Sequence, residues 1–145
     1  MAYGTLRKVS GSEKDAAGTG RDFRFGRFAE EKAVELLVAK GYAIRHRNWR
    51  CGRIEIDIIA QKADWIVFVE VKARSGEWEA PDAAVDRRKM KSLSAGADVY
   101  LRGMPVVCNY RFDIITLTGN IDAFTIEHIE DAFMPPLSGR GAGSF

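Results

Sequence analysis

The chain has 145 residues, of which 46% are hydrophobic and 29% charged, a balance typical of one soluble globular domain. No stretch approaches the roughly 18 consecutive apolar residues of a membrane span, so we expect no membrane partner. The net charge of +2 selects no class of partner, and the two cysteines, Cys51 and Cys108, form neither a metal-ligand pair nor a disulfide framework.

The two ends of the chain differ in composition from its middle. Residues 1–20 are rich in Gly, Ser, Ala and Lys and lack periodicity, which predicts a flexible N-terminal arm. They contain no apolar block typical of a secretion signal, and a reducing cytoplasm is therefore the expected location. Residues 135–145 form a second predicted flexible tail, which leaves residues 21–134 for the folded domain.

The first predicted element is a helix over Asp22–Lys40, ended by Gly41. At helical spacing Glu30 lies on the same side as Ala33 and Leu37, inside the apolar stripe of this helix. A carboxylate on a core-facing surface is costly unless it is paired or bound to a cation. A polar edge to the stripe is the alternative explanation.

The remaining predicted elements are mainly strands. The segment Tyr42–Arg50 is a short strand or extended segment, and the polar turn Gln61–Asp64 joins two strands into a hairpin. The two strands of the hairpin are Arg53–Ala60 and Trp65–Arg74. A second helix is predicted over Ala80–Gly103 and a further strand over Arg111–Leu117. The last element, Phe124–Phe133, fits either a strand or a short helix. This order predicts an α/β fold, with a mixed β-sheet flanked by α-helices.

Charged residues interrupt both strands of the predicted hairpin. Side chains alternate across a strand, so each strand divides into two faces. In the first strand the two sets are Ile54, Ile56 and Ile58 against Glu55, Asp57 and Ile59. In the second strand they are Val67, Val69 and Val71 against Ile66, Phe68, Glu70, Lys72 and Arg74.

The turn decides whether these charges meet. A turn centred on residues 62–63 places Asp57 opposite Phe68 and brings Asp57, Glu70 and Lys72 to one face. A slip of one residue would send the second strand's set to the opposite face. Two interpretations stay open: a structural salt bridge between the lysine and the acids, and a metal or acid–base site.

With Glu30 added, three acids and one lysine converge in this prediction. Carboxylate oxygens suit Mg²⁺ or Mn²⁺, and such an ion polarises a phosphoryl oxygen and lowers the pKa of a bound water. A lysine beside the metal orients that water, acts as its base or stabilises developing charge. His46 and His128 are isolated in the sequence, and no spacing supports a Ser-His-Asp or Cys-His site.

Basic residues gather in two short segments, Arg45–Arg53 and Asp86–Lys91. Local basic stripes track phosphates, although solvated surfaces have the same composition. Asp113 is expected to be the structural partner of a nearby arginine. The candidate nucleic-acid-binding residues are Arg47, Asn48, Arg50, Arg74 and Lys89.

A family resemblance rests on these residues. Asp57, followed after twelve residues by Glu70-Val71-Lys72, is similar to the signature of the restriction-endonuclease-like PD-(D/E)xK superfamily. The wider series RFAEEKAVELLVAKGYAIRHRNWR, IEIDIIA, FVEVKAR and RFDIITL resembles the YraN family of bacterial proteins over about residues 22–118. That family is related in fold to archaeal Holliday-junction resolvases. Ile54 and Ala29 stand where the family usually has glycine.

The resemblance implies a restriction-endonuclease-like sheet with a divalent-metal site, holding Mg²⁺ or Mn²⁺. Asp57 and Glu70 would hold the metal, Glu30 would be an outer or additional ligand, and Lys72 would be the catalytic lysine. The expected function is a metal-dependent nuclease that hydrolyses DNA phosphodiester bonds on branched or structured DNA, and cutting a junction implies a homodimer. The alternatives are an inactive nucleic-acid-binding or assembly module with the same fold, and a purely structural salt-bridged domain.

Overall fold

The computed structural model describes residues 17–76 and 87–134. Within these ranges, two helices and five strands follow one another along the chain. Their bounds are α1 Ala17–Ala39, β1 Ala43–Cys51, β2 Ile54–Lys62, β3 Trp65–Arg74, α2 Arg87–Arg102, β4 Asn109–Gly119 and β5 Phe124–Ile129.

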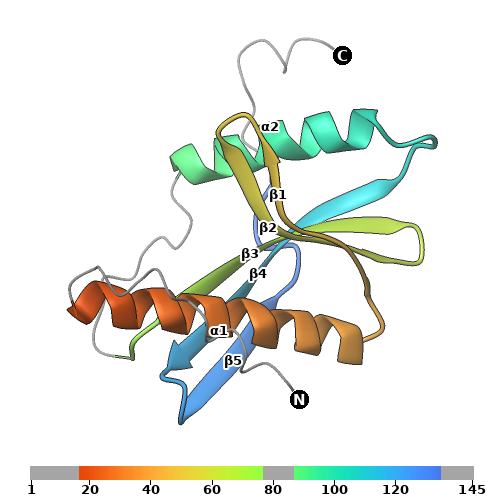
Figure 1. The fold of residues 1–145 in the computed structure, drawn as a ribbon. Helices are drawn as coiled ribbons and strands as arrows, with labels where there is room; N and C mark the ends of the chain where they lie inside the picture. The colour runs from red at the N-terminus through yellow and green to blue at the C-terminus, as the bar shows by residue number, and fades with distance from the viewer. Residues whose placement is uncertain (1–16, 77–86, 135–145) are drawn as a thin grey trace.

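The strands form one sheet in their sequence order, β1-β2-β3-β4-β5. Neighbouring strands are antiparallel except β3 and β4, which are parallel because the chain returns through α2 between them. Figure 1 shows the sheet between the two helices, with α1 on one side and α2 on the other. The predicted α/β class is confirmed, and the mixed sheet flanked by helices has the restriction-endonuclease-like architecture.

The layer between α1 and the sheet is built on small helical residues. Ala29, Ala33 and Leu37 are fully buried, one helical turn apart from each other. They pack on a set of strand residues that includes Ile58, Ala60, Val67, Val69, Ile115 and Leu117. Because alanine carries a single methyl group, the helix lies close to the sheet, which brings Glu30 near the strands.

The second layer, between α2 and the sheet, packs Leu93 and Ala97 on residues that include Ile56, Ile59, Ile66, Phe68 and Phe112. Gly96 lets the helix come close: a Cβ there would lie 2.8 Å from the Cγ2 of Ile54 and 3.1 Å from the Cδ1 of Ile56. Ile54, which stands where the family usually has glycine, therefore fills the space above Gly96.

The C-terminus of α1 confirms the predicted stop at Gly41. Gly41 has a φ of 95°, and its N–H donates to the carbonyl of Val38, while the N–H of Tyr42 donates to the carbonyl of Leu37. This pair of bonds is a Schellman motif, which satisfies carbonyls that the helix leaves unpaired. The motif turns the chain into β1.

Several element bounds differ from the sequence predictions. Helix α1 begins at Ala17, earlier than the predicted Asp22, and β5 is a strand, which settles the alternative left open there. Residues 80–86 of the predicted second helix, residues 1–16 of the predicted arm and the predicted tail 135–145 lie outside the described residues. Neither α1 nor α2, in the part of the chain described, is long and apolar enough to cross a membrane.

The β2–β3 hairpin has a different register from the predicted one. Lys62 pairs with Trp65, so the turn is Ala63–Asp64, and Phe68 lies opposite Ile59 instead of Asp57. Ala63 has a φ of 56°, a left-handed conformation that alanine rarely adopts and that no local pattern predicts. Because the shift is an even number of residues, each side chain within the paired stretch keeps its predicted face.

The alternation of β2 breaks at Asp57, contrary to prediction. Ile54 and Ile56 pack with the α2 layer, whereas Ile58 lies in the α1 layer, so the three isoleucines do not share a face. The described pairing of β2 with β3 ends at Ile58 opposite Val69. Across from the break, Asn48 of β1 has a φ of 53°. The strand therefore twists where it leaves β3.

Candidate metal and nucleic-acid site

Asp57 lies where β2 separates from β3. The backbone N–H of Val71 donates to the Oδ2 of Asp57 at 2.8 Å, beyond the last described pair of the two strands. The carboxylate thus takes the place of a strand carbonyl as the acceptor for this N–H. This hydrogen bond fixes the side chain of Asp57 in the opening between the strands.

Glu70 is the residue of β3 next to that opening. It is 7% exposed, and its Oε1 has no hydrogen-bond partner among the described residues. A buried carboxylate oxygen without a partner is unfavourable, and such an atom calls for an explanation. A bound cation would supply one.

Glu30 lies on α1 between the buried Ala29 and Ala33, in the apolar stripe where the sequence placed it. Burial, and then the negative charge of Asp57, raise the pKa of Glu30 to about 7. Arg27 and Arg47 oppose this shift.

The electrostatics link the three acids. Burial, and then the charge of Asp57, raise the pKa of Glu70 to about 7 as well. Burial also raises the pKa of Asp57, against the Val71 N–H and the positive charge of Lys89. Asp57 thus acts on both glutamates, and the three carboxylates lie within electrostatic reach of one another.

Two lysines accompany the acids. Lys72, partly buried on β3, lowers the pKa of both Asp57 and Glu70 through its charge. Lys89, predicted as a phosphate contact, lies in the first turn of α2, and its Nζ lies 3.6 Å from the Oε2 of Glu70. The sequence did not indicate this pairing, because it depends on how α2 packs across the sheet.

The donor set fits a hard divalent ion held by two carboxylates. No three histidine, cysteine or acidic side chains in residues 17–76 and 87–134 form a group able to hold a metal ion, so Glu30, Asp57 and Glu70 do not make a closed ligand shell here. Mg²⁺ is usually bound by one or two carboxylates and keeps several waters. Asp57 and Glu70 would supply such a pair, because Glu70 has an unpartnered oxygen and a cation would lower their raised pKa values.

The other candidate nucleic-acid-binding residues lie around this site on separate elements. Arg47, Asn48 and Arg50 are exposed on β1, at the edge of the sheet, and Arg74 ends β3. Arg47 pairs with Glu31 at 2.8 Å, and Arg50 with Glu55 at 3.5 Å. Arg47 and Arg50 therefore have acidic partners within the protein.

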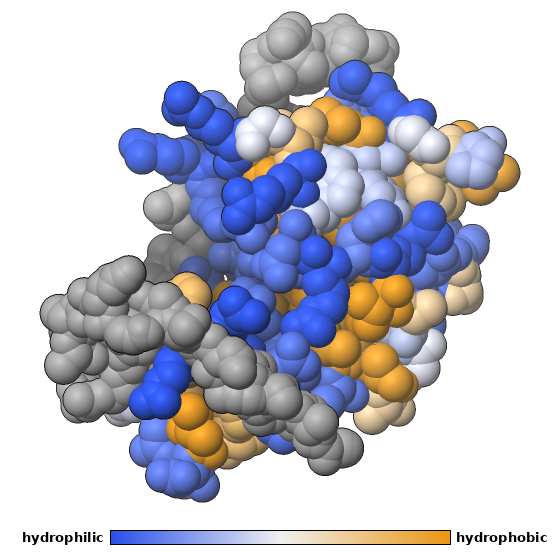
Figure 2. Space-filling model, in the orientation of Figure 1, coloured by the Kyte–Doolittle hydropathy of each residue, from blue (hydrophilic) through white to orange (hydrophobic). Residues whose placement is uncertain are grey.

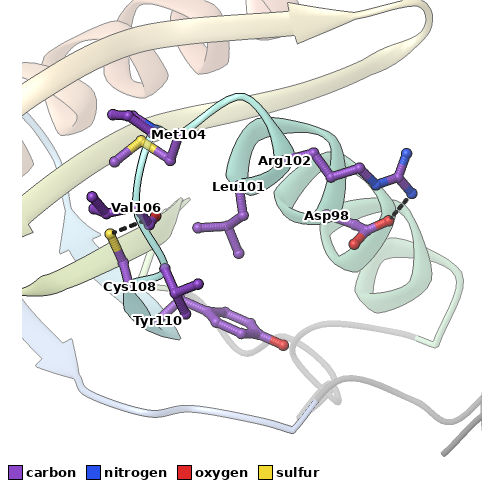
Figure 3. Close-up of a pocket in the computed structure, with 9 residues that line it drawn as sticks. Asp98, Leu101, Arg102, Met104, Val106, Cys108 and Tyr110 are labelled. Carbon is purple, nitrogen blue, oxygen red and sulfur yellow. Dashed lines mark hydrogen bonds and ion pairs between the residues drawn. The ribbon is translucent and has the colours of Figure 1, made fainter.

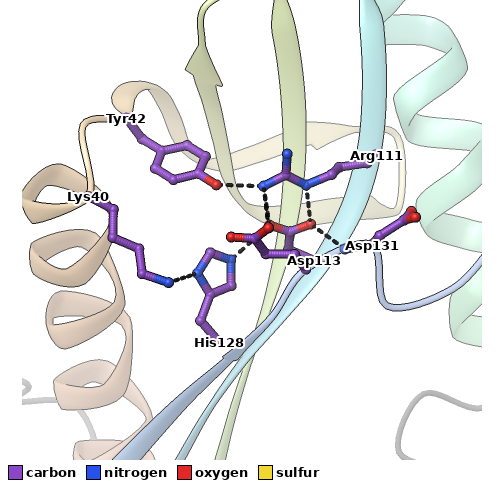
Figure 4. Close-up of polar contacts among 7 residues, drawn as sticks. Lys40, Tyr42, Arg111, Asp113, His128 and Asp131 are labelled. Carbon is purple, nitrogen blue, oxygen red and sulfur yellow. Dashed lines mark hydrogen bonds and ion pairs between the residues drawn. The ribbon is translucent and has the colours of Figure 1, made fainter.

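A second buried acid, Asp113, has a complete set of partners (Figure 4). As predicted, it pairs with an arginine: the Nε of Arg111 donates to its Oδ1 at 2.9 Å. His128 Nε2 lies 2.8 Å from its Oδ2, and the N–H of Asp131 donates to its Oδ1. Burial alone would raise the pKa of Asp113, but these partners lower it.

His128 is not isolated, contrary to the sequence prediction. Its Nδ1 lies 2.8 Å from the Nζ of Lys40, the first residue after α1. Arg111 also contacts the hydroxyl of Tyr42. The network joins α1, β4 and β5 and is shielded from solvent at its centre. Only the register of β4 with β5, which pairs Ile115 with His128, could have indicated it.

A hollow of about 430 Å³ lies at the C-terminal end of α2 (Figure 3). It is lined by Leu101, Met104, Val106, Cys108 and Tyr110 among others, and its Asp98 pairs with Arg102. Lys89 lies at the opposite end of the same helix. The hollow is therefore separate from the candidate site.

Sequence comparison with known proteins identifies a family and several relatives of this chain. The family described as "Uncharacterised protein family UPF0102" matches residues 29–117, a range that includes all of the site residues named above from Glu30 to Lys89. A UPF0102 protein of Phocaeicola vulgatus is 47% identical over 114 residues, which cover 78% of this chain and 94% of that protein. One from Myxococcus xanthus is 36% identical over 115 residues, covering 75% and 88%. The protein therefore belongs to the UPF0102 family, the YraN family that its sequence resembles.

Proposed function

We propose that the protein is a divalent-metal-dependent nuclease that hydrolyses DNA phosphodiester bonds, with branched or structured DNA as its substrate. The observation that carries this proposal is the buried, unpartnered carboxylate oxygen of Glu70, beside Asp57 and two residues before Lys72. The buried Asp113, by contrast, has partners at both of its oxygens.

Each residue has a distinct role in this proposal. Asp57 and Glu70 would hold Mg²⁺ or Mn²⁺, and Glu30 would hold a water of its outer shell. When bound, such an ion polarises a phosphoryl oxygen and lowers the pKa of a water. Lys72 orients the attacking water and stabilises the negative charge that develops on the phosphate.

The surroundings of the site suit a phosphate backbone. Figure 2 shows hydrophilic residues over much of the face on which the β1–β2 hairpin lies in Figure 1. Arg47 and Arg50 on β1 and Arg74 on β3 supply positive charge on this part of the sheet. Contacts of this kind position a nucleic acid without reading its sequence.

The test is a cleavage panel with a four-way junction, a flap, a single strand and a plain duplex, as DNA and as RNA. Each substrate is incubated with Mg²⁺, Mn²⁺ or a chelator. We expect cleavage with metal only, and a loss of about 100-fold or more in Asp57→Asn and Lys72→Met. The matched control is Glu127→Gln, an exposed acid on β5, which should cut like the wild type.

A second candidate is an inactive nucleic-acid-binding module with the same fold. It is favoured by the lack of a three-ligand metal group among the described residues. Binding of DNA that survives Asp57→Asn, with no cleavage by the wild type, would select the module and reject the nuclease.

Cutting both strands of a junction requires two active sites, so the proposal includes a homodimer. Analytical ultracentrifugation with and without a junction tests it. A monomer under both conditions would exclude paired cutting by a stable dimer.

A further inference from the structure

Lys89 brings a positive charge to the acids from α2, on the side of the sheet opposite to α1 and Glu30. It lies in the first turn of α2, and its Nζ is 3.6 Å from the Oε2 of Glu70. The side chain of Glu70 is 9% exposed and that of Lys89 is 42% exposed. The lysine therefore reaches in from the solvent side to a carboxylate that is otherwise buried.

This ion pair is incomplete. A charge-assisted hydrogen bond between an ammonium and a carboxylate is about 2.7–2.9 Å long, shorter than the separation found here. The Oε1 of Glu70 has no partner among the described residues. Lys89 thus offsets the charge of Glu70 but leaves Oε1 without a partner, and a divalent ion would compete with Lys89 for the same carboxylate.

We propose that Lys89 is an internal counter-cation that pairs with the carboxylate of Glu70 when no metal is bound, and that metal binding releases it to contact a phosphate of the nucleic acid. The inference rests on the proposed function, because it requires Glu70 and Asp57 to take the metal. If metal binding frees Lys89 for a phosphate, metal raises the affinity for nucleic acid, and by linkage nucleic acid raises the affinity for metal by the same factor.

The release needs no movement of the backbone. A lysine has a flexible four-carbon stem and three rotatable donors, so its ammonium can turn away while its Cα stays in place. Helix α2 is held tightly, because Leu93 and Ala97 are buried and Gly96 lies against Ile54. The neighbouring Arg87, Arg88 and Lys91 are exposed on the same end of the helix. A released Lys89 would join an existing group of basic side chains.

The first test measures metal affinity by calorimetric titration with Mn²⁺, without nucleic acid. We expect Lys89→Met to bind Mn²⁺ about 5-fold more tightly than the wild type, because the competing ammonium is gone. Lys89→Arg should keep the wild-type affinity. Lys91→Met, an exposed lysine of the same helix, is the matched control and should also match the wild type.

The second test measures DNA binding by fluorescence anisotropy, with all proteins carrying Lys72→Met to prevent turnover. Mg²⁺ should tighten binding about 5-fold or more when Lys89 is present and less when it is Met. With Mg²⁺ present, the slope of log affinity against log salt concentration should be smaller by about one in the Lys89→Met protein, because one phosphate contact is lost. Thermal unfolding checks that each variant is folded.

The outcomes separate the two proposals. A wild type that binds no Mn²⁺ would overturn the proposed function and this inference with it. A wild type that binds Mn²⁺ with the same affinity as Lys89→Met would overturn the inference alone. Tighter Mn²⁺ binding by Lys89→Met, with a weaker effect of Mg²⁺ on DNA binding, supports it.

Discussion

Asp113 and Glu70 are buried acids on adjacent strands, but only Asp113 has hydrogen-bond partners at both carboxylate oxygens. In the parallel pairing of β3 with β4, Asp113 lies opposite Val69 and Glu70 opposite Ile114, one position apart along the sheet. Asp113 is fully buried, receives partners at both oxygens and has a lowered pKa. Glu70 is almost as buried, has an unpartnered oxygen and has a pKa raised to about 7.

The difference separates an acid that stabilises the fold from one that awaits a ligand. Burial by itself does not distinguish them, since both side chains are removed from water. What distinguishes them is whether the fold supplies donors for the charge that it buries. The following experiments test this distinction through the free energy of unfolding.

The largest effect is expected at Asp113. Replacing it with Asn leaves the charge of Arg111, which is 17% exposed, without its buried partner. Breaking a buried ion pair costs about 3–5 kcal/mol, and we expect Asp113→Asn to fall in the lower part of that range. Urea denaturation at pH 7 measures it. A loss below about 1 kcal/mol would contradict the structural role of the network.

The pH dependence should show both kinds of acid. Glu30 and Glu70 have folded pKa values of about 7 against ordinary values of 4.5, so the native state binds more protons between these values. Their contribution is greatest below pH 4.5 and is lost as the pH rises through 7. Asp113 acts in the opposite direction, because its lowered pKa gives stability that is lost as the pH falls below its ordinary 3.8.

We therefore expect maximum stability near pH 5, with a loss of about 2–3 kcal/mol by pH 8 in the absence of metal. Urea denaturation across pH 3–9 measures the curve, and adding Mg²⁺ at pH 8 should recover part of the loss. Stability that rises steadily from pH 5 to pH 8 would mean that the two glutamates are not buried in this way.

Replacing Glu70 with Gln should be stabilising, the reverse of Asp113→Asn. Glutamine keeps the shape and removes the buried charge, so at pH 8 we expect a gain of about 1–2 kcal/mol without metal, and no gain at pH 5. Mn²⁺ should stabilise the wild type more than this variant. Glu127→Gln on β5, which is exposed, serves as the control and should change neither measurement.

The smallest effect is expected at the rim of the satisfied network. Lys40 is exposed and contacts only the outer nitrogen of His128 there. Lys40→Met should cost about 0.5–1 kcal/mol, as for a single hydrogen bond in water. Thermal unfolding measures this loss of stability. A loss as large as that of Asp113→Asn would show that the buried network needs the exposed Lys40 contact to stay intact.

Much of the fold follows from local patterns. The apolar run of β3 and the polar residues before it predict the strand Trp65–Arg74 with the bounds that the structure has, and Gly41 marks the end of α1. The hairpin register was missed because four consecutive polar or small residues, 61–64, allow more than one turn. The turn that forms places Ala63 at a positive φ, which no rule for alanine indicates.

The site was harder to predict where it depends on distant packing. Alternation suggested that Glu70 and Lys72 share a face, and helical spacing suggested Glu30. The twist at Asp57 depends on where β2 leaves β3, and the approach of Lys89 depends on Gly96 allowing α2 close to Ile54. Neither relation has a signal within its own stretch of sequence.

The shape of β1 has a consequence for aggregation. As an edge strand it offers unpaired backbone groups to other chains, but a register irregularity lies between Ile44 and His46, and Asn48 bends the backbone. Arg47 and Arg50 add charge to the same edge. Charged and irregular edges discourage strand-to-strand association. Removing both arginines together would therefore leave an edge strand more prone to aggregation. Substituting them one at a time, and measuring light scattering, separates a loss of solubility from a loss of nucleic-acid binding.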